Sequence, residues 1–456
     1  MEIYRYRPYN EYDKIGLENS EIYFPELSQL NDPMEGYTDI YFQGDKVIWT
    51  NLLRNYLRSL FEAFLFAQIS KPLPEAPEDL FIPLIPFHLW PDEQFEKIQS
   101  LDWFNTLPQQ FINQKAVKSL IENVVNKHIS REQLLCSLKV IHPIALQITT
   151  QYMIDSQLLR TSNYPVPQVS QDEINWDIFF SINNDEKIGD ISSLLNQISD
   201  SIPLLTDQID ARSQHLCLDF PNLFIQKLEN VMYPQFYAAC FSENPKNSSM
   251  WGNYANSHKG ICLKFNIDDG LPLYAPCGIG THGKIYEWLP HKFYKINYSN
   301  KLISLNFFEN MGNISLGILN KLWLKDNETN EVTTIKLIDD ETRNTYWQNI
   351  YDALTQKTKD WAYEKEHRLL LNNMFGSFYD KKDRTLKYQF NNLEGIIFGM
   401  KCPDKNKREI IKIIINKCQK EGRDNFKFYQ AYYNQKTCSI DLREDPICHF
   451  LKLNKK

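Results

Sequence analysis

The 456-residue sequence lacks several features that would assign it to a class at once. It has no uninterrupted apolar run of about 18 residues, which a membrane-spanning helix requires, because its most apolar helical segment contains Arg54, Arg58 and Glu62. Residues 1–14 lack the charged-then-apolar layout of a secretory signal peptide. The nine cysteines include no C-x-x-C pair, which in a long chain favours reduced thiols. We therefore expect a cytoplasmic protein without a membrane span.

The common catalytic signatures are also missing. There is neither an H-E-x-x-H zinc motif nor a G-x-S-x-G nucleophile motif, and the neighbouring Cys448 and His449 do not have metal-ligand spacing. Residues 278–283 match G-x-G-x-x-G, but a Pro-rich segment precedes them and a strand-like segment follows. A dinucleotide motif needs a strand before it and a helix after it. The match is interpreted as accidental, and no metal is expected.

What the sequence does contain is aromatic and unevenly charged. The 27 Phe, 25 Tyr and 9 Trp provide ample apolar area for a folded core. The net charge is −7, yet from Lys381 onward there are 18 Lys and Arg against 9 Asp and Glu. A basic end of this kind could contact nucleic acid, or it could be the solvated face of a helix such as Lys405–Lys420. Both readings remain open.

Hydrophobic periodicity predicts strands at both ends of the chain and helices between them. Predicted strands cover residues 3–9, 21–24, 235–242, 260–265, 368–371, 395–399 and 426–432. Predicted helices cover residues 12–19, 47–66, 115–128, 130–159, 188–205, 249–257, 345–358 and 404–421. Pro-rich links are expected at residues 71–86 and 163–168. This order predicts an α+β fold with a small mixed or antiparallel sheet. We expect a core of residues 1–44 plus 216–456, and a mostly helical insertion at 45–215.

The segment Glu364-Lys365-Glu366 is the strongest candidate for chemistry. If it is extended, both carboxylates and Arg368 lie on one face, because strand side chains alternate. Two such carboxylates could bind a sugar hydroxyl and stabilise developing positive charge. The alternative is a surface ladder of ion pairs.

A second candidate lies between two predicted strands. The strand ending at Ser242 is followed by Trp251, Tyr254 and His258 at helical spacing i, i+3 and i+7. That helix face could stack on a planar ring, or it could pack against the sheet.

Several short motifs, in this order, resemble the bacterial family called domain of unknown function 2971. The motifs are Tyr4-Arg5-Tyr6-Arg7-Pro8, Asn31-Asp32-Pro33-Met34-Glu35, Cys240-Phe241-Ser242-Glu243, Met250-Trp251-Gly252-Asn253-Tyr254, His258-Lys259-Gly260 and Trp361-Ala362-Tyr363-Glu364-Lys365-Glu366-His367-Arg368. The resemblance spans roughly 1–44, 231–300 and 346–432, and the family name implies no function.

The layout is also distantly similar to that of ADP-ribosyltransferases, with an aromatic first strand, a middle strand ending in Phe-Ser and a late Glu-x-Glu. This similarity implies an ADP-ribosyltransferase-like fold and NAD as substrate. Nicotinamide would leave through a cationic state that a carboxylate stabilises. The implied catalytic residues are Arg5 holding the dinucleotide, Ser242 supporting the ribose, Glu366 binding its 2′-hydroxyl and Glu364 orienting the acceptor. The implied cofactor-binding residues are Tyr6, Trp251, Tyr254, His258 and Arg368.

Two other classes of function remain open. One is a nucleic-acid-binding or nuclease-type effector that uses the basic C-terminal region with His258, Lys259, Glu366 and Arg368. The other is a non-catalytic interaction module. The resemblances favour a toxin or antiviral defence protein that modifies a macromolecular acceptor, either protein or nucleic acid. The acceptor, the oligomeric state and the role of the insertion are not determined by the sequence.

Overall fold

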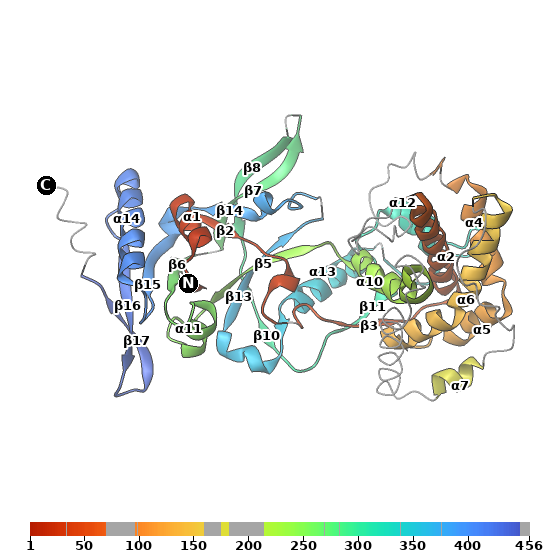
Figure 1. Ribbon diagram of the computed structural model, residues 1–456, viewed down its shortest axis with the longest axis horizontal. Coiled ribbons are helices and arrows are strands. Elements are labelled where there is room, and N and C mark those ends of the chain that lie inside the picture. The colour runs from red at the N-terminus through yellow and green to blue at the C-terminus, as the bar shows by residue number, and fades with distance from the viewer. Residues whose placement is uncertain are drawn as a thin grey trace. The chain divides into compact units, whose positions relative to one another are not determined.

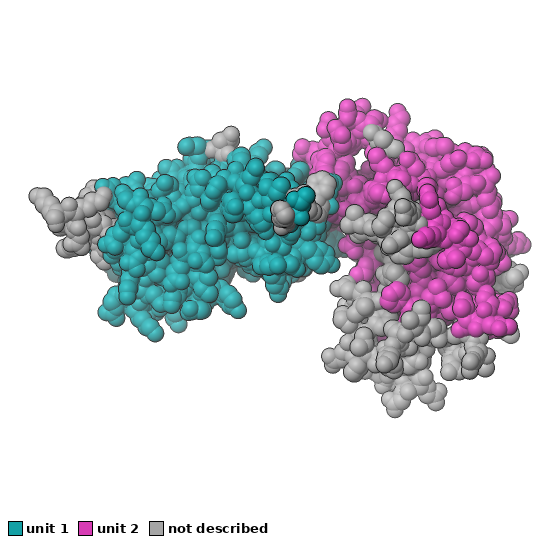
Figure 2. All heavy atoms as spheres, turned by 90° about the horizontal axis from the view of Figure 1, so that it is seen from above, with its two compact units in different colours: residues 1–37, 235–302, 351–456 teal, residues 38–234, 303–350 magenta. Residues whose placement is uncertain are grey.

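The computed structural model describes residues 1–32, 34–69, 96–97, 99–158, 175–181, 214–268, 270–281, 283–337, 339–374 and 376–446. The described part contains eleven α-helices and four sheets. Contacts divide the chain into two compact units, coloured separately in Figure 2. Unit 1 comprises residues 1–37, 235–302 and 351–456, and unit 2 comprises residues 38–234 and 303–350. The expected α+β class is confirmed.

Unit 1 is built on a mixed sheet of eight strands (Figure 1), which is larger than the small sheet we expected. All neighbouring pairs are antiparallel except β15 with β16. In spatial order the strands are β17 (Ser439–Glu444), β16 (Lys427–Asn434), β15 (Leu393–Phe398), β6 (Ile261–Asn266), β1 (Glu2–Arg7), β5 (Phe236–Ser242), β13 (Glu366–Asn372) and β9 (Tyr294–Lys295).

The two faces of this sheet carry different residues because successive strand side chains alternate. One face contributes Ile3, Phe241 and Leu369 to the larger hydrophobic core of unit 1. Helices α1 (Glu11–Asn19) and α14 (Asp404–Glu421) contribute to the same core, as does a second sheet. That second sheet has the order β2 (Glu21–Tyr23), β14 (Thr385–Tyr388), β7 (Leu271–Gly280) and β8 (Gly283–His291).

The opposite face of the eight-stranded sheet carries a smaller aromatic core. Tyr4 and Tyr6 of β1 pack there with Met250 and Trp251. Met250 and Trp251 belong to α11 (Ser248–Tyr254), whose N-cap Asn247 accepts a hydrogen bond from the Met250 amide. A short pair, β10 (Asn297–Tyr298) with β12 (Gln356–Lys357), also belongs to unit 1.

Unit 2 is mostly helical and has a hydrophobic core of its own. Its described helices are α2 (Lys46–Ile69), α4 (Asp102–Ile112), α5 (Lys115–Val124), α6 (Arg131–Asp155), α7 (Trp176–Ser181), α10 (Phe220–Met232) and α12 (Leu316–Leu319). Its sheet has the order β11 (Ser304–Asn306), β3 (Asp39–Phe42) and β4 (Ile129–Ser130). Helix α13 (Asp340–Leu354) contains the boundary between the units.

The units differ from the segment boundaries expected from sequence. Residues 303–350 group with the helical unit rather than with the strand-rich one. The reason is packing: β11 pairs with β3, while Phe307, Phe308 and Trp323 join the core formed by α2. Periodicity within a segment cannot reveal which core its apolar residues enter.

Several element predictions are confirmed. Helix α14 has the predicted bounds, and Ser130 and Gln133 form the expected capping box at the start of α6. The predicted helix at 345–358 is too long at its end, because α13 stops at Leu354 and β12 follows. Gly278 and Gly283 lie in the β7–β8 hairpin, so the G-x-G-x-x-G match precedes no helix. The predicted helix 188–205 and both Pro-rich links lie outside the described residues.

Candidate functional site

Glu364 and Glu366 are positioned by a break between two backbone conformations. The 3-10 helix η6 (Lys359–Glu364) ends at Glu364, Lys365 has a φ of 46°, and β13 begins at Glu366. The expectation of one extended segment is therefore wrong, because Lys365 is left-handed. The carboxylates nevertheless converge, since Lys357 Nζ lies 2.8 Å from Glu364 and 2.6 Å from Glu366.

Arg368 connects the Glu364 and Glu366 pair to Glu35, in the N-terminal segment of unit 1. Its Nε donates to Glu366 at 2.7 Å and its Nη1 donates to the Leu354 carbonyl at 2.6 Å. Arg368 also forms an ion pair with Glu35, whose second oxygen lies 3.5 Å from Lys357 Nζ. The result is a set of three carboxylates and two cations, with side chains at most 5% exposed. We call these residues the charged cluster: Glu35, Lys357, Glu364, Glu366 and Arg368.

The carboxylates of the charged cluster have different proton affinities. Burial opposes ionisation of Glu366, but Arg368 and Lys357 outweigh it and lower its pKa. Burial raises the pKa of Glu35 despite Arg368 and Lys357, and it raises the pKa of Glu364 despite Lys357. Carboxylates whose pKa values are pushed apart are typical of acid–base sites, although structural ion networks produce the same effect. The burial of all five side chains leaves little room for a ligand here.

Tyr254 and Ser242 support the charged cluster, and both were singled out from sequence. The Tyr254 hydroxyl donates to Glu364 Oε1 and also bonds the Asn31 side chain. Ser242 is fully buried, and its Oγ donates to the Glu364 carbonyl at 2.6 Å. The three sequence stretches around Asn31, Tyr254 and Glu364 therefore meet in one place. Ser242 orients the backbone of Glu364 and does not present a free hydroxyl.

Trp251, Tyr6 and His258 pack with one another, which differs from the expected cofactor-stacking role. Trp251 is fully buried and its Nε1 donates to the Pro245 carbonyl at 2.8 Å. The Tyr6 ring meets the Trp251 ring edge-on at 5.1 Å, and its hydroxyl donates to Asn244. The His258 ring is nearly parallel to Trp251, with centroids 6.5 Å apart. Because Trp251 is fully buried between Tyr6 and His258, its ring has no open face for nicotinamide or adenine.

Arg5 does not join the charged cluster. Tyr4 is paired with Ser242, and Ser242 is paired with Glu366, so these three side chains share one face. Arg5 follows Tyr4 on β1 and therefore points to the other face, where its guanidinium lies 5.3 Å from the centre of the Phe241 ring. The expected arrangement of Arg5, Ser242 and Glu366 around one dinucleotide is not formed.

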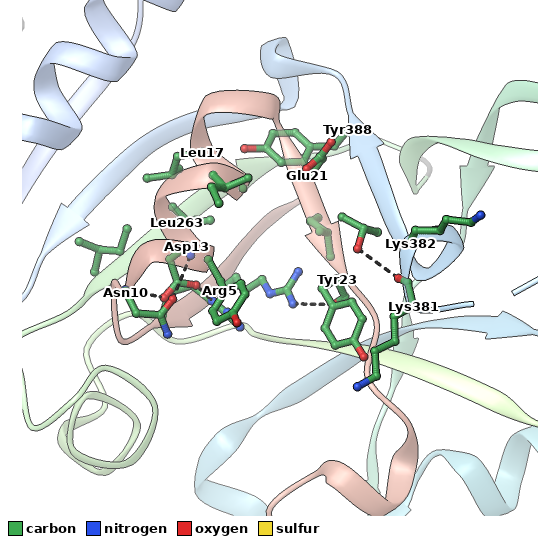
Figure 3. Close-up of a pocket in the computed structure, with 17 residues that line it drawn as sticks. Arg5, Asn10, Asp13, Leu17, Glu21, Tyr23, Leu263, Lys381, Lys382 and Tyr388 are labelled. Carbon is green, nitrogen blue, oxygen red and sulfur yellow. Dashed lines mark hydrogen bonds and ion pairs between the residues drawn. The ribbon is translucent and has the colours of Figure 1, made fainter. Parts of the chain in front are cut away.

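On its own face, Arg5 lines a pocket of about 640 Å³ (Figure 3). The pocket lies between β1, α1, β2 and the residues that precede β14. Its charged lining residues are Arg5, Arg7, Asp13, Glu21, Lys381 and Lys382. Its aromatic lining residues are Tyr12, Tyr23 and Tyr388. This volume falls within the range of small-molecule sites.

The pocket has an excess of positive charge. Arg7 and Asp13 form an ion pair and compensate each other. This leaves Arg5, Lys381 and Lys382 against Glu21 in the lining, with Lys382 also 3.5 Å from Asp380 at the exposed rim. No carboxylate of the described residues is within ion-pair distance of Arg5, which donates to the Tyr23 carbonyl at 3.2 Å. Burial and the neighbouring Arg7 lower the pKa of Arg5 to about 9.

Several residues of the charged cluster and of the pocket were not predicted from the sequence. Glu35 was part of a recognised motif but had no assigned role, and Lys357 had no motif at all. A lysine in a polar segment looks like a solvated residue, and only its burial at 7% exposure distinguishes Lys357. Lys381 and Lys382 contributed to the basic count, but nothing in the sequence placed them beside Arg5.

Within the described ranges, no group of three or more His, Cys, Asp or Glu side chains is arranged to hold a metal ion. Nor does that part of the chain contain a helix long and apolar enough to cross a membrane. Residues 250–369 match the model of a family described as a protein of unknown function, DUF2971. The match contains four members of the charged cluster and excludes Arg5. Comparison with curated proteins and with solved structures finds no match.

Proposed function

We propose that unit 1 binds a phosphate-bearing small molecule of the nucleotide class in the Arg5 pocket. The supporting observation is Arg5, which is 7% exposed and forms no ion pair with a carboxylate among the described residues. A buried charge without a counter-ion is costly. A phosphate group would supply the missing acceptors, because the guanidinium fork matches two phosphate oxygens.

The rest of the pocket suits such a ligand. Lys381 and Lys382 add two exposed cations at the rim, where they would attract an anion and contact its outer oxygens. Tyr12 is 84% exposed, so its ring offers a free face to a base. NAD is the first ligand to test, because the resemblance to ADP-ribosyltransferases gave Arg5 the role of holding a dinucleotide.

ADP-ribosyl transfer from NAD is a more demanding hypothesis. It needs a carboxylate beside the ribose, but Glu366 is 3% exposed and its side chain is on the sheet face opposite Arg5. Ligand binding therefore has better support than transfer. A role in toxicity or antiviral defence follows from the distant resemblance alone. Unaltered host growth and phage plating on expression would argue against that role.

Calorimetric titration of the full chain with NAD, ATP and inorganic phosphate tests the binding proposal. We expect at least one of the three to bind, and Arg5→Gln to weaken that binding about 10- to 100-fold, the effect of losing a charged hydrogen bond. Arg443→Gln is the matched control, because Arg443 is an exposed arginine of β17. Binding by none of the three ligands, or equal binding by Arg5→Gln and the parent, would contradict the proposal.

The same samples test transfer. Release of nicotinamide from NAD by the parent but not by Glu366→Gln, with both folded, would support it. Binding without nicotinamide release would leave a nucleotide-binding protein.

A further inference from the structure

The β7–β8 hairpin exposes a ladder of three aromatic side chains. The ring of Tyr274 lies 5.6 Å from that of Tyr286 and 5.5 Å from that of Trp288. Tyr274 is 39% exposed, Trp288 is 46% exposed and Tyr286 is partly exposed. We call these three residues the aromatic ladder. The hairpin is the long green one that bears the labels β7 and β8 in Figure 1.

The aromatic ladder is not needed for the core. Leu271, Leu273 and Ala275 alternate with Tyr274 along β7, and all three are buried in the larger core of unit 1. The ladder therefore occupies the face of the hairpin that points away from that core. Neighbouring rings exposed on a sheet mark a binding surface, because such apolar area gains by being covered.

Basic residues adjoin the aromatic ladder. Tyr274 pairs with Trp288 on one side and with Lys387 of β14 on the other, so the three side chains form one cross-strand row. Lys387 is exposed and pairs in turn with Glu21, which lines the Arg5 pocket. Lys381 and Lys382 shortly precede β14 and are exposed as well.

The charge of the whole unit is consistent with this local pattern. Unit 1 contains 32 Lys and Arg against 26 Asp and Glu, a net charge of +6. Unit 2 contains 18 against 31, a net charge of −13. The net charge of −7 for the chain is therefore the sum of an acidic unit 2 and a basic unit 1, and unit 1 carries the aromatic ladder.

We propose that the aromatic ladder is a stacking platform for a single-stranded nucleic acid. Its bases stack on Tyr274, Tyr286 and Trp288, and its phosphates contact Lys387, Lys381 and Lys382. Stacked rings beside lysines match the alternation of base and phosphate along an unpaired strand. Stacking accepts any base, so the expected preference is for unpaired over duplex strands and not for one sequence. This inference shares Lys381 and Lys382 with the Arg5 pocket, but the three stacking residues do not line that pocket.

Fluorescence anisotropy of labelled 12-nucleotide dT and U oligomers with the full chain tests the inference. We expect binding to weaken about 10-fold in Trp288→Ala and in Tyr274→Ala, within the range found for single stacked bases. Tyr433→Ala is the control, because Tyr433 is 54% exposed on β16, in the other sheet. In Lys387→Gln the slope of log affinity against log salt should fall by about 0.7, the value for one lost phosphate contact to a single strand.

Three results would overturn the inference. In the first, the parent binds neither oligomer at low salt. In the second, Trp288→Ala binds as tightly as the parent, and in the third, a duplex of equal length binds as tightly as the single strand. Unfolding midpoints of the variants exclude a general loss of structure. Titration of Trp288→Ala with NAD, ATP and phosphate separates the ladder from the pocket, because pocket binding should remain when oligomer binding is lost.

Discussion

Arg5 and Glu366 point to opposite faces of one eight-stranded sheet. The register fixes this relationship: Tyr4 pairs with Ser242, Ser242 pairs with Glu366, and Arg5 is one residue further along β1. Each face has its own polar feature, the Arg5 pocket on one side and the charged cluster on the other. The two features can therefore be tested separately.

Arg5 and Arg368 should respond differently to replacement by methionine. Arg368 and Lys357 together compensate the three carboxylates of the charged cluster. Arg368→Met leaves these three buried carboxylates with one cation and should destabilise the protein by about 3–5 kcal/mol. Arg5 forms no ion pair with a carboxylate in the described part of the chain, so Arg5→Met should leave stability unchanged or raise it by about 1 kcal/mol. Urea unfolding of both variants checks this. Equal losses would mean that Arg5 is a structural residue like Arg368.

The pH dependence of stability should reveal the buried proton-binding groups. Burial raises the pKa of Glu35, so the folded state holds that proton more tightly than the unfolded chain. Its contribution is fully present below about pH 4.5 and is lost as pH rises through the folded pKa. Glu35→Gln lacks this loss, so the stability of the variant relative to the parent should rise as the pH increases above about 4.5, which denaturation midpoints measure.

Glu366→Gln should behave in the opposite sense. Although burial opposes ionisation, Arg368 and Lys357 lower the Glu366 pKa, so its contribution is present above about pH 4.5 and is lost as pH falls through the folded pKa. The deficit of Glu366→Gln relative to the parent should therefore shrink below pH 4.5. The same denaturation series provides the test, and parallel pH curves for Glu35→Gln and Glu366→Gln would refute both assignments.

Replacement of Trp251 and of Trp288 should have different effects on stability and on oligonucleotide binding. Trp251 is fully buried, so Trp251→Ala should cost about 3–5 kcal/mol. Trp288 is 46% exposed, so Trp288→Ala should cost less than about 1 kcal/mol while it weakens oligonucleotide binding. Thermal unfolding of the two variants gives the comparison. A large loss in Trp288→Ala would assign the aromatic ladder to structure.

Gly252 and Gly260 provide a test of the backbone around α11. A Cβ at Gly252 meets nothing within 4 Å, so Gly252→Ala should stabilise the helix by about 0.5–1 kcal/mol. A Cβ at Gly260 would lie 2.1 Å from the Arg7 carbonyl, so Gly260→Ala should cost about 3 kcal/mol or more. Circular dichroism melting curves distinguish the two signs. A neutral Gly260→Ala would mean that β1 and the end of the α11 loop are not in close contact.

Much of the secondary structure was predictable because its cause is local. The bounds of α14 and the capping box at Ser130 follow from periodicity and from one side chain bonding a nearby amide. The sequence showed the motifs that contain Asn31, Tyr254 and Glu364, but it did not predict that these residues are in contact. No spacing rule brings distant segments together. The prediction that Glu364-Lys365-Glu366 is extended was wrong, because Lys365 is left-handed at the junction where the 3-10 helix η6 ends and β13 begins.

By itself, the sequence determined the class of fold, the helices and about half of the described strands of unit 1, and the candidate site residues. Only the tertiary structure decided which of them act together. Strand register divides Arg5 from Glu366, and burial turns Trp251 into a packing residue and Lys357 into the centre of an ion network. Register and burial depend on segments hundreds of residues apart, and the charge of a side chain has its effect only once its neighbours and its exposure are fixed.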